Sequence, residues 1–344
     1  MSTWRELKDN PRLNKIYRDR IAIIKAVREF FWSAGFLETD TPVAVKYPGQ
    51  EPYLNPIPVT IHDPNGRAEQ FYLHTSPEFS LKKLLAAGFE KIFHITKCFR
   101  DYESFGGNHN PEFTMLEWYS APGTLEQIMD DTENLFKHIG KILGKNFVAY
   151  QNKKINIAEK SDRKSMKQVW QEYGGANLDD YLTVESLQQL VKERGLTVAE
   201  KDAYEDLFFK FFLNFVEPKL GMERPVFVFD YPKQMSSLSK TCAHDPRYAE
   251  RFELYIGGLE IANAFGELTD PVEQEKRLDN DRALRQKLGK ETWPVDPSFI
   301  QALESGIAEA GGIALGVDRV VLLFTEAKDI NEVIFQSVND QLTP

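Results

Sequence analysis

Apolar and charged residues alternate along residues 12–34 with the three- and four-residue spacing of an amphipathic helix. The apolar positions of this stretch are Leu13, Ile16, Ile23, Val27, Phe30 and Phe31. Gly35 follows directly and predicts the end of the helix, and residues 36–45 then read as an extended stretch that contains Pro42. Because proline cannot donate a hydrogen bond to a neighbouring strand, we expect this strand at a sheet edge or an interface.

The pattern changes to short strands and helices further along the chain. We expect strands near residues 71, 91–100, 111–119, 225–231, 252–266 and 313–316, with helices over 77–87 and 318–325. Residues 121–222 differ, because helical patterns near 124–143, 164–173, 183–194 and 202–216 indicate a mostly helical insertion. Strands joined by short loops, with helices grouped outside them, predict an α+β fold in which helices flank an antiparallel β-sheet, as a single domain over residues 1–344.

The composition restricts the class of protein. Of the 344 residues, 42% are hydrophobic and 27% are charged, which is typical of a globular protein. The net charge of −10 counts against broad nucleic-acid binding as the main task. The chain has two cysteines, a polar start without the apolar core of a signal peptide, and no run of about 18 apolar residues. We therefore expect a cytoplasmic protein with no membrane segment.

Two glycines in the segment FELYIGGLEIANAFGEL predict a β-hairpin with its turn at Gly257 and Gly258. With that turn Tyr255 faces Glu260, and Glu253 lies diagonally on the same face. Two carboxylates on one face repel each other unless a cation lies between them, and a divalent cation such as Mg²⁺ on a substrate phosphate is the natural occupant. The alternative is a solvated face with the glutamates bridged by water or lysine.

Two other residues of this segment, Asn263 and Glu267, would lie on the opposite face from Glu260 under strict alternation. They join the same site only through a bulge or a bend in the second strand.

The strand 111–119 carries Glu117 and Tyr119 on one face, flanked by apolar side chains. A carboxylate and a phenol so placed can receive an ammonium group in a mostly apolar slot. The alternative is a half-buried strand whose glutamate is paired with a nearby lysine or arginine. Arg100 ends one strand and Arg319 follows another, and forked guanidinium groups suit carboxylate or phosphate, although each could equally be a surface residue.

Taken in order, these segments resemble the signature motifs of class II aminoacyl-tRNA synthetases, and specifically of the lysyl branch. Residues 34–42 (AGFLETDTP) look like motif 1, residues 95–119 (ITKCFRDYESFGGNHNPEFTMLEWY) like motif 2, and residues 311–324 (GGIALGVDRVVLLF) like motif 3. The segments TSPE (75–78) and 252–268 are similar to lysyl-family sequences almost residue for residue. The resemblance spans nearly the whole chain and implies the class II synthetase catalytic fold.

The resemblance also implies roles for individual residues. ATP would be bound by Arg100, His109, Asn110, Phe113, Glu260, Ile261, Gly316 and Arg319, of which Arg100 and Arg319 would be catalytic. Magnesium would be bound by Glu253 and Glu260. The amino acid would be bound by Ser76, Glu78, Glu117, Tyr119, Asn263, Glu267 and Ala314.

Two positions distinguish this chain within that resemblance. Ala314 stands where true lysyl-tRNA synthetases usually have glycine, and the methyl group would reshape the pocket beside the substrate amine. The family usually reads Arg-x-Glu in motif 2, but here Arg100 is followed by Asp101, Tyr102 and only then Glu103. Either Asp101 or Glu103 could take the place of the motif 2 glutamate beside ATP.

Motif 1 begins within the first 35 residues, which leaves no room for the N-terminal anticodon-binding domain of a lysyl-tRNA synthetase. The chain therefore most resembles the truncated lysyl-tRNA synthetase paralogues, ATP-dependent ligases that attach (R)-β-lysine to a lysine of elongation factor P. The resemblance implies ATP and Mg²⁺, β-lysine or lysine as substrate, elongation factor P as acceptor in place of tRNA, and a homodimer. The alternatives are a minimal lysyl-tRNA synthetase that charges tRNA and a non-catalytic paralogue that acts as a binding or regulatory subunit.

Overall fold

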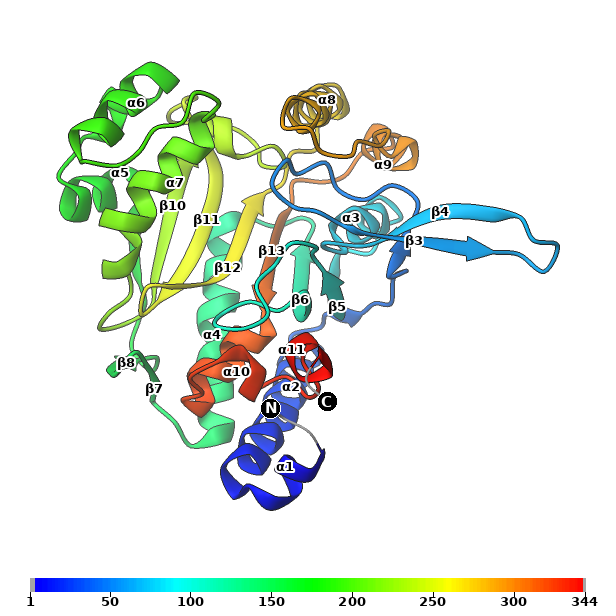
Figure 1. Cartoon of the computed structure of the whole chain (residues 1–344), viewed down its shortest axis with the longest axis vertical. Coiled ribbons are helices and arrows are strands. Elements are labelled where there is room, and N and C mark those ends of the chain that lie inside the picture. The colour runs from blue at the N-terminus through cyan, green and yellow to red at the C-terminus, as the bar shows by residue number, and fades with distance from the viewer. Residues whose placement is uncertain (1–3, 343–344) are drawn as a thin grey trace.

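An eight-stranded sheet forms the centre of the computed structural model, which describes residues 4–342 (Figure 1). The strand order is β1-β5-β6-β13-β12-β11-β10-β9. These strands are β1 (Leu37–Glu38), β5 (Lys91–Phe99), β6 (Glu112–Ser120), β9 (Asp162–Ser165), β10 (Val226–Pro232), β11 (Tyr248–Ile256), β12 (Leu259–Gly266) and β13 (Gly311–Gly316). Neighbours from β5 to β10 are antiparallel, and a short parallel strand is added at each edge, β1 on β5 and β9 on β10. The expected α+β fold is confirmed.

One face of the sheet is covered by three helices. These are α2 (Pro11–Ser33), α4 (Leu125–Leu143) and α10 (Val317–Thr325). The amphipathic helix predicted near the start of the chain is α2, whose N-terminus is capped by the Asn10 side chain with Pro11 in the first turn. Gly35 adopts a φ of 80°, which allows the chain to leave the helix and enter β1 at the sheet edge. The expected strand 36–45 is interrupted at Pro42, and its second part is β2 (Ala44–Val45).

The segment 121–222 is only partly an insertion. Its first helix, α4, packs against α2 and belongs to the main core, so the segment that stands apart begins later than expected. It also contains the hairpin β7 (Phe147–Tyr150) and β8 (Lys153–Asn156), as well as β9. The helical remainder is α5 (Met166–Val169), a π-helical turn (Trp170–Gly174), a 3₁₀ turn (Leu178–Tyr181), α6 (Val184–Glu193) and α7 (Tyr204–Phe215).

This helical remainder forms a second apolar cluster on the other face of the sheet. Strand β11 separates the two clusters, because Phe252, Leu254 and Ile256 point into the first while Tyr248 and Tyr255 point into the second. The second cluster covers β10 and β11. The same face over β12, β13 and β6 is hollow and contains the cavity described below.

The remaining elements surround that open face. They are α3 (Glu78–Ala86), α8 (Pro271–Lys287), α9 (Pro297–Glu304), and a three-stranded sheet of β2, β4 (Ala68–Leu73) and β3 (Ile57–His62), of which the β3–β4 hairpin projects from the body (Figure 1). Outside these lie α1 (Trp4–Asp9), α11 (Val338–Leu342) and short 3₁₀ turns at Glu217–Lys219, Lys233–Met235 and Ile330–Glu332.

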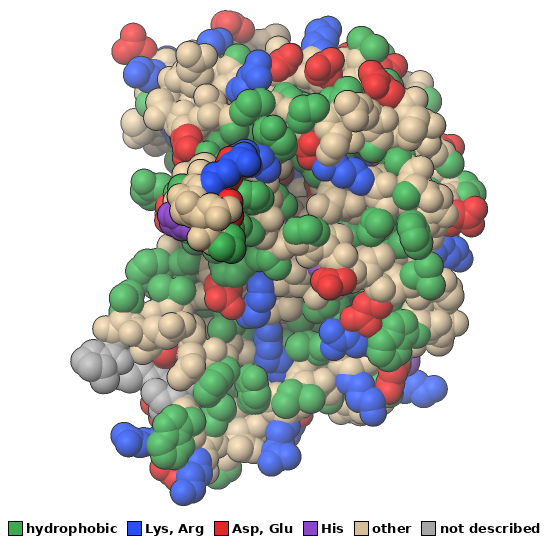
Figure 2. Space-filling view, turned by 90° about the vertical axis from the view of Figure 1, so that its right-hand side faces the viewer, with side chains coloured by type: hydrophobic (Ala, Val, Ile, Leu, Met, Phe, Trp, Pro, Cys, Tyr) green, Lys and Arg blue, Asp and Glu red, His purple; other side chains and the backbone are tan. Residues whose placement is uncertain are grey.

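Two surface properties bear on the expectations from composition. On the face shown in Figure 2, lysine and arginine side chains are interspersed with aspartate and glutamate, so this face presents mixed charge. Over the described residues, no helix combines the length and the apolar character needed to cross a bilayer.

Candidate active site

The predicted hairpin is present, and its register explains how one strand serves two parts of the site. Gly257 and Gly258 both have positive φ, at 66° and 77°, as a two-residue turn of this kind requires. Tyr255 pairs with Glu260, as expected, but the register shifts by one residue between this pair and the next. This shift is a β-bulge, one of the two features through which Asn263 was expected to join the site. Because of it, Asn263 lies directly opposite Glu253 and joins the same face as Glu260.

Glu253 and Glu260 differ in how their charges are met. Glu253 is 3% exposed, and its carboxylate accepts hydrogen bonds from the hydroxyls of Tyr231 and Tyr255 and forms an ion pair with Arg251. Glu260 faces the cavity, where the nearest cation is Arg319, at 3.8 Å from its Oε2.

The electrostatics of this pair fit a bound divalent cation. Burial and the negative charge of Glu253 raise the pKa of Glu260, so the two carboxylates repel each other in the free protein. A hard cation with oxygen ligands would remove that repulsion, and carboxylates are its preferred protein ligands. The two glutamates therefore suit Mg²⁺, with Glu260 as the more accessible ligand.

A second group of residues forms a pocket for an ammonium group. Glu117 is 1% exposed, and its two oxygens accept hydrogen bonds from Ser76 (2.6 Å) and Tyr119 (2.9 Å). Burial, followed by the negative charge of Glu78, raises the pKa of Glu117 to about 8. The alternative, in which this glutamate pairs with a lysine or arginine, does not hold, because among the described residues no such cation lies within ion-pair distance of Glu117.

Beside Glu117 lies an internal ion pair that sequence reasoning missed. The Lys82 ammonium lies 2.5 Å from Glu78 Oε1 and 2.6 Å from Glu267 Oε2. Burial alone would lower the pKa of Lys82, but the charges of Glu267 and Glu78 outweigh it and raise that pKa. Burial also raises the pKa of Glu267, to about 7. One feature of the sequence could have indicated that Lys82 is buried, since it lies next to Leu81 on the apolar side of α3.

Glycine is required where β13 passes beneath this group. A Cβ atom on Gly312 would lie 2.3 Å from Glu267 Oε1 and 2.2 Å from Tyr119 Cε1. Two residues further along β13, Ala314 pairs with Asn263 on one side and with Glu117 on the other, and its methyl group lines the cavity. Asn263 Oδ1 is buried without a hydrogen-bond partner among the described residues, so it can accept a hydrogen bond from a ligand.

The other end of the cavity is basic and aromatic. The Arg100 guanidinium lies 5.0 Å from the ring centroid of Phe113, and its Nε is buried without a hydrogen-bond partner in the described part of the chain. Arg319 donates to the Glu260 carbonyl (2.7 Å) and lies 3.3 Å from His109 Nε2. Both guanidinium groups thus face the cavity with donors available for carboxylate or phosphate.

The loop after Arg100 selects between two acidic candidates. Asp101 is exposed, and Tyr102 follows with a φ of 62°. Glu103 lines the cavity, where its carboxylate is 2.9 Å from His109 Nδ1 and that hydrogen bond lowers its pKa. The geometry favours Glu103 as the counterpart of the motif 2 glutamate.

These groups surround one cavity of about 340 Å³. The sequence-predicted residues in its wall are Ser76, Glu78, Arg100, His109, Asn110, Phe113, Tyr119, Glu260, Ile261, Asn263, Ala314, Gly316 and Arg319. Three predicted residues lie behind the wall: Glu117, which Ser76 and Tyr119 contact, Glu253, and Glu267, which Lys82 contacts. The Asn110 side chain, which was expected to bind ATP, donates to the Glu112 carbonyl and accepts from the Val338 backbone N–H. In this structure it therefore fixes the position of the loop.

The chain is similar in sequence to proteins of one known family along most of its length. The family model of the class II tRNA synthetases (D, K and N) matches residues 2–339. A lysine–tRNA ligase of Mesomycoplasma hyopneumoniae is 38% identical over 335 residues, which cover 96% of this chain and 66% of the relative. The chain thus spans slightly less than two thirds of the length of that relative.

Relatives of a second kind match along nearly their whole length. The elongation factor P–(R)-β-lysine ligase of Pseudoalteromonas translucida is 37% identical over 92% of this chain and 93% of the relative. The protein of the same name from Haemophilus influenzae (strain PittGG) is 35% identical over 99% of both chains.

Proposed function

Since the chain belongs to the class II tRNA synthetases (D, K and N), we propose that it is an ATP-dependent ligase that activates (R)-β-lysine, or lysine, as an aminoacyl-adenylate. It then transfers the aminoacyl group to a lysine side chain of elongation factor P. The acceptor is suggested by the relatives named elongation factor P–(R)-β-lysine ligase, which the chain matches along 93 to 99% of their length.

The observation that carries the choice of amino acid is the charge of the pocket. Glu78, Glu117 and Glu267 supply three carboxylates, and the Lys82 ammonium, buried among them, offsets one. Once Glu117 is ionised on ligand binding, two negative charges remain, which match the two ammonium groups of lysine or β-lysine. A pocket that leaves buried carboxylates unpaired binds a neutral analogue poorly, because those charges would then lack a partner.

The substrate carboxylate lies toward Arg100 in this orientation. Its guanidinium can contact both the carboxylate and the α-phosphate, while Arg319 contacts the outer phosphates and Phe113 stacks on adenine. Glu253 and Glu260 would hold magnesium, which would shield the triphosphate charge. Activation joins a carboxylate oxygen to the α-phosphorus and releases pyrophosphate, so these residues act by positioning and charge stabilisation.

The preference for the β-amino acid rests on Ala314. Its methyl group lies between Asn263 and Glu117 in the sheet register, beside the expected position of the substrate amine. Moving the amine from the α to the β carbon shifts one charge by about one bond, roughly 1.5 Å. A methyl group at this point favours the isomer whose amine lies further from it.

The test is ATP–pyrophosphate exchange with (R)-β-lysine and with α-lysine, followed by incubation with elongation factor P or with tRNA. We expect exchange with both lysines, faster with the β-isomer, and label on elongation factor P alone. Efficient charging of tRNA would favour the lysine–tRNA ligase activity named in the other relatives, and absence of exchange would favour a non-catalytic paralogue. A cytoplasmic homodimer is part of the same proposal.

A further inference from the structure

We propose that Glu51 receives the ammonium group of the acceptor lysine and takes its proton during the transfer step, and that the acceptor side chain enters through a second cavity. This inference rests on the proposed function, since it assigns a residue and a route to its second half-reaction.

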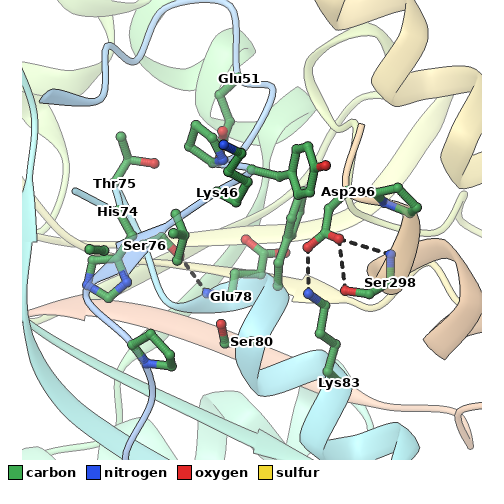
Figure 3. Close-up of a pocket in the computed structure, with 18 of the residues that line it drawn as sticks. Lys46, Glu51, His74, Thr75, Ser76, Glu78, Ser80, Lys83, Asp296 and Ser298 are labelled. Atoms are coloured by element: carbon green, nitrogen blue, oxygen red, sulfur yellow. Dashed lines mark hydrogen bonds and ion pairs between the residues drawn. The ribbon is translucent and has the colours of Figure 1, made fainter. Parts of the chain in front are cut away.

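The second cavity, of about 520 Å³, adjoins the first. Its walls come from the loop 42–51, from residues 74–80 at the start of α3, and from the start of α9 (Figure 3). Glu51, Ser76 and Glu78 line both cavities, so they form a shared wall. A side chain in the second cavity would therefore reach the first past Glu51, Ser76 and Glu78, and the first cavity is lined by Arg100, beside which the proposed function places the activated carboxyl group.

Glu51 is the acidic group of that wall with no partner for its charge. No lysine or arginine of the described chain forms an ion pair with its carboxylate; the Arg285 guanidinium donates instead to the Glu51 backbone carbonyl, at 2.7 Å. Burial and the negative charge of Glu78 raise the pKa of Glu51, while Arg100 and Arg285 act in the opposite direction. The negative charge of Glu51 also contributes, after burial, to raising the pKa of Asp281 on α8.

The local backbone is built to accommodate this carboxylate. A Cβ atom on Gly49 would lie 2.2 Å from Glu51 Oε2, so any other residue at position 49 would displace the carboxylate. The cationic groups of the second cavity are already paired. Lys83 pairs with Asp296 at 2.5 Å (Figure 3), and Lys46 pairs with Glu69 at 2.7 Å.

Charge matching assigns Glu51 to the acceptor and not to the amino acid. The two ammonium groups of lysine or β-lysine are matched by Glu78, Glu117 and Glu267 together with Lys82. Glu51 is one further negative charge, and the transfer step brings one further ammonium group. That group must lose a proton before it can act as a nucleophile, since the ordinary lysine pKa is about 10.4.

One proton passes from the acceptor ammonium to Glu51, and the freed nitrogen lone pair forms a bond with the carbonyl carbon of the adenylate. The bond between that carbon and the phosphate oxygen breaks with its electron pair on oxygen, which releases AMP. The nitrogen gives its second proton to the departing phosphate, and a neutral amide remains.

The experiment separates the two half-reactions in Glu51→Gln. We expect ATP–pyrophosphate exchange within about threefold of the wild type, and transfer to elongation factor P reduced about 100-fold at pH 7, as for loss of a general base. Transfer by the variant should rise about tenfold per pH unit between pH 7 and 9, because water must then remove the proton, while the wild type changes less.

Two further measurements make the result specific. Hydroxylamine is largely uncharged at pH 7 and needs no base, so Glu51→Gln should form the aminoacyl-hydroxamate at the wild-type rate. Gly49→Ala, which displaces the carboxylate without removing it, should lose transfer in the same way. Asp296→Asn is the matched control, since Asp296 lines the same cavity but is paired with Lys83, and it should change transfer by less than about threefold.

Loss of pyrophosphate exchange in Glu51→Gln would assign Glu51 to the amino acid and overturn the inference, as would transfer at the wild-type rate. A wild-type enzyme that forms the hydroxamate but modifies no lysine of elongation factor P would refute the proposed function, and the acceptor role of Glu51 with it.

Discussion

The Lys82 ammonium lies 2.6 Å from Glu267 Oε2, and only 2% of each side chain is exposed to solvent. A buried lysine and glutamate cost free energy to desolvate, and the pair persists only because each compensates the other. The consequence is that the pocket keeps a fixed cation, which under the proposed function sets how many ammonium groups the substrate must carry.

Replacing Lys82 by methionine should destabilise the protein by about 3–5 kcal/mol, because two buried carboxylates lose their partner. The pKa of Glu267 is raised even in the wild type, so the stability that it contributes is present at low pH and is lost as the pH rises through its folded value. The deficit should therefore be larger at pH 8 than at pH 5.5. Urea unfolding at both pH values measures it.

The neighbouring residue gives the control for that variant. Lys83 pairs with Asp296, and 32% of the lysine side chain is exposed. Lys83→Met should cost about 1 kcal/mol or less. Equal losses in the two variants would mean that the Lys82 pair is no more important for stability than a pair whose lysine is partly exposed.

Substrate binding should release a proton from Glu117. With its pKa raised to about 8, this carboxyl group is mostly protonated at pH 7 in the free protein, whereas an ammonium ligand binds the charged form. The apparent affinity for the amino acid should then fall about tenfold for each pH unit below 8. Calorimetry at pH 7 in two buffers of different ionisation enthalpy counts the proton, and an identical heat in both would contradict the prediction.

The two candidate metal ligands should respond differently to substitution by glutamine. Glu260→Gln should raise the magnesium concentration needed for pyrophosphate exchange and leave the melting temperature unchanged or higher, since it removes a repulsion with Glu253. Glu253→Gln should lower both exchange and stability, because Arg251 loses the partner of its charge. Exchange and thermal melting measured on both variants test this, and near-wild-type exchange by Glu260→Gln at limiting magnesium would refute the magnesium assignment.

Ala314→Gly should narrow or reverse the preference for (R)-β-lysine over α-lysine. Loss of one methyl contact in a pocket of this kind changes discrimination by roughly 10- to 200-fold. The ratio of kcat/KM for the two isomers in pyrophosphate exchange measures the change. Equal efficiency for both isomers in the wild type, unaltered by the substitution, would remove Ala314 from the explanation.

Helix α2 and β1 should form the contact of a homodimer. Ile21, Trp32 and Leu37 are large apolar side chains that are 57%, 53% and 55% exposed along this unit. Trp32→Glu should produce monomers in sedimentation velocity, whereas Phe147→Glu, at a 40% exposed site on β7, should not. An active wild-type monomer at micromolar concentration would contradict the prediction.

The parts of the site that the sequence predicted are those set by local rules. The pair Gly257 and Gly258 marks a turn by itself, and the turn fixes the register of Tyr255 against Glu260. Alternation along β6 likewise placed Glu117 and Tyr119 on one face. The family resemblance supplied the proposed roles, and most of the residues to which it assigns them line one cavity.

The parts that were missed depend on contacts between distant segments. The ion pair between Lys82 and Glu267 joins residues 185 positions apart, and the four-residue spacing of Glu78 and Lys82 is also that of a solvent-exposed pair on a helix. Glu51 lies in a loop with no periodic pattern, and its burial follows from α8 and α3 closing around it. The spacing of residues along the chain predicts neither this burial nor this pairing, because both depend on contacts between distant segments.

The bulge in β12 changes which face of the sheet the even-numbered and the odd-numbered residues of that strand occupy. Before it, Glu260 faces the phosphate end of the cavity; after it, Asn263 and Phe265 face the amino-acid end, while Ala262 and Ala264 point into the core. In a strand of the same length without the bulge, strict alternation would exchange the two sets, with an amide in the core and methyl groups in the pocket. Ile261 is the extra residue, since without it Glu260 and Asn263 would lie two positions apart and the observed pairs would form a regular ladder. The bulge therefore brings Glu260 and Asn263 to one face although they are three positions apart, whereas the tip of the β3–β4 hairpin projects from the body and can vary in length without altering the facing of any ligand-binding residue.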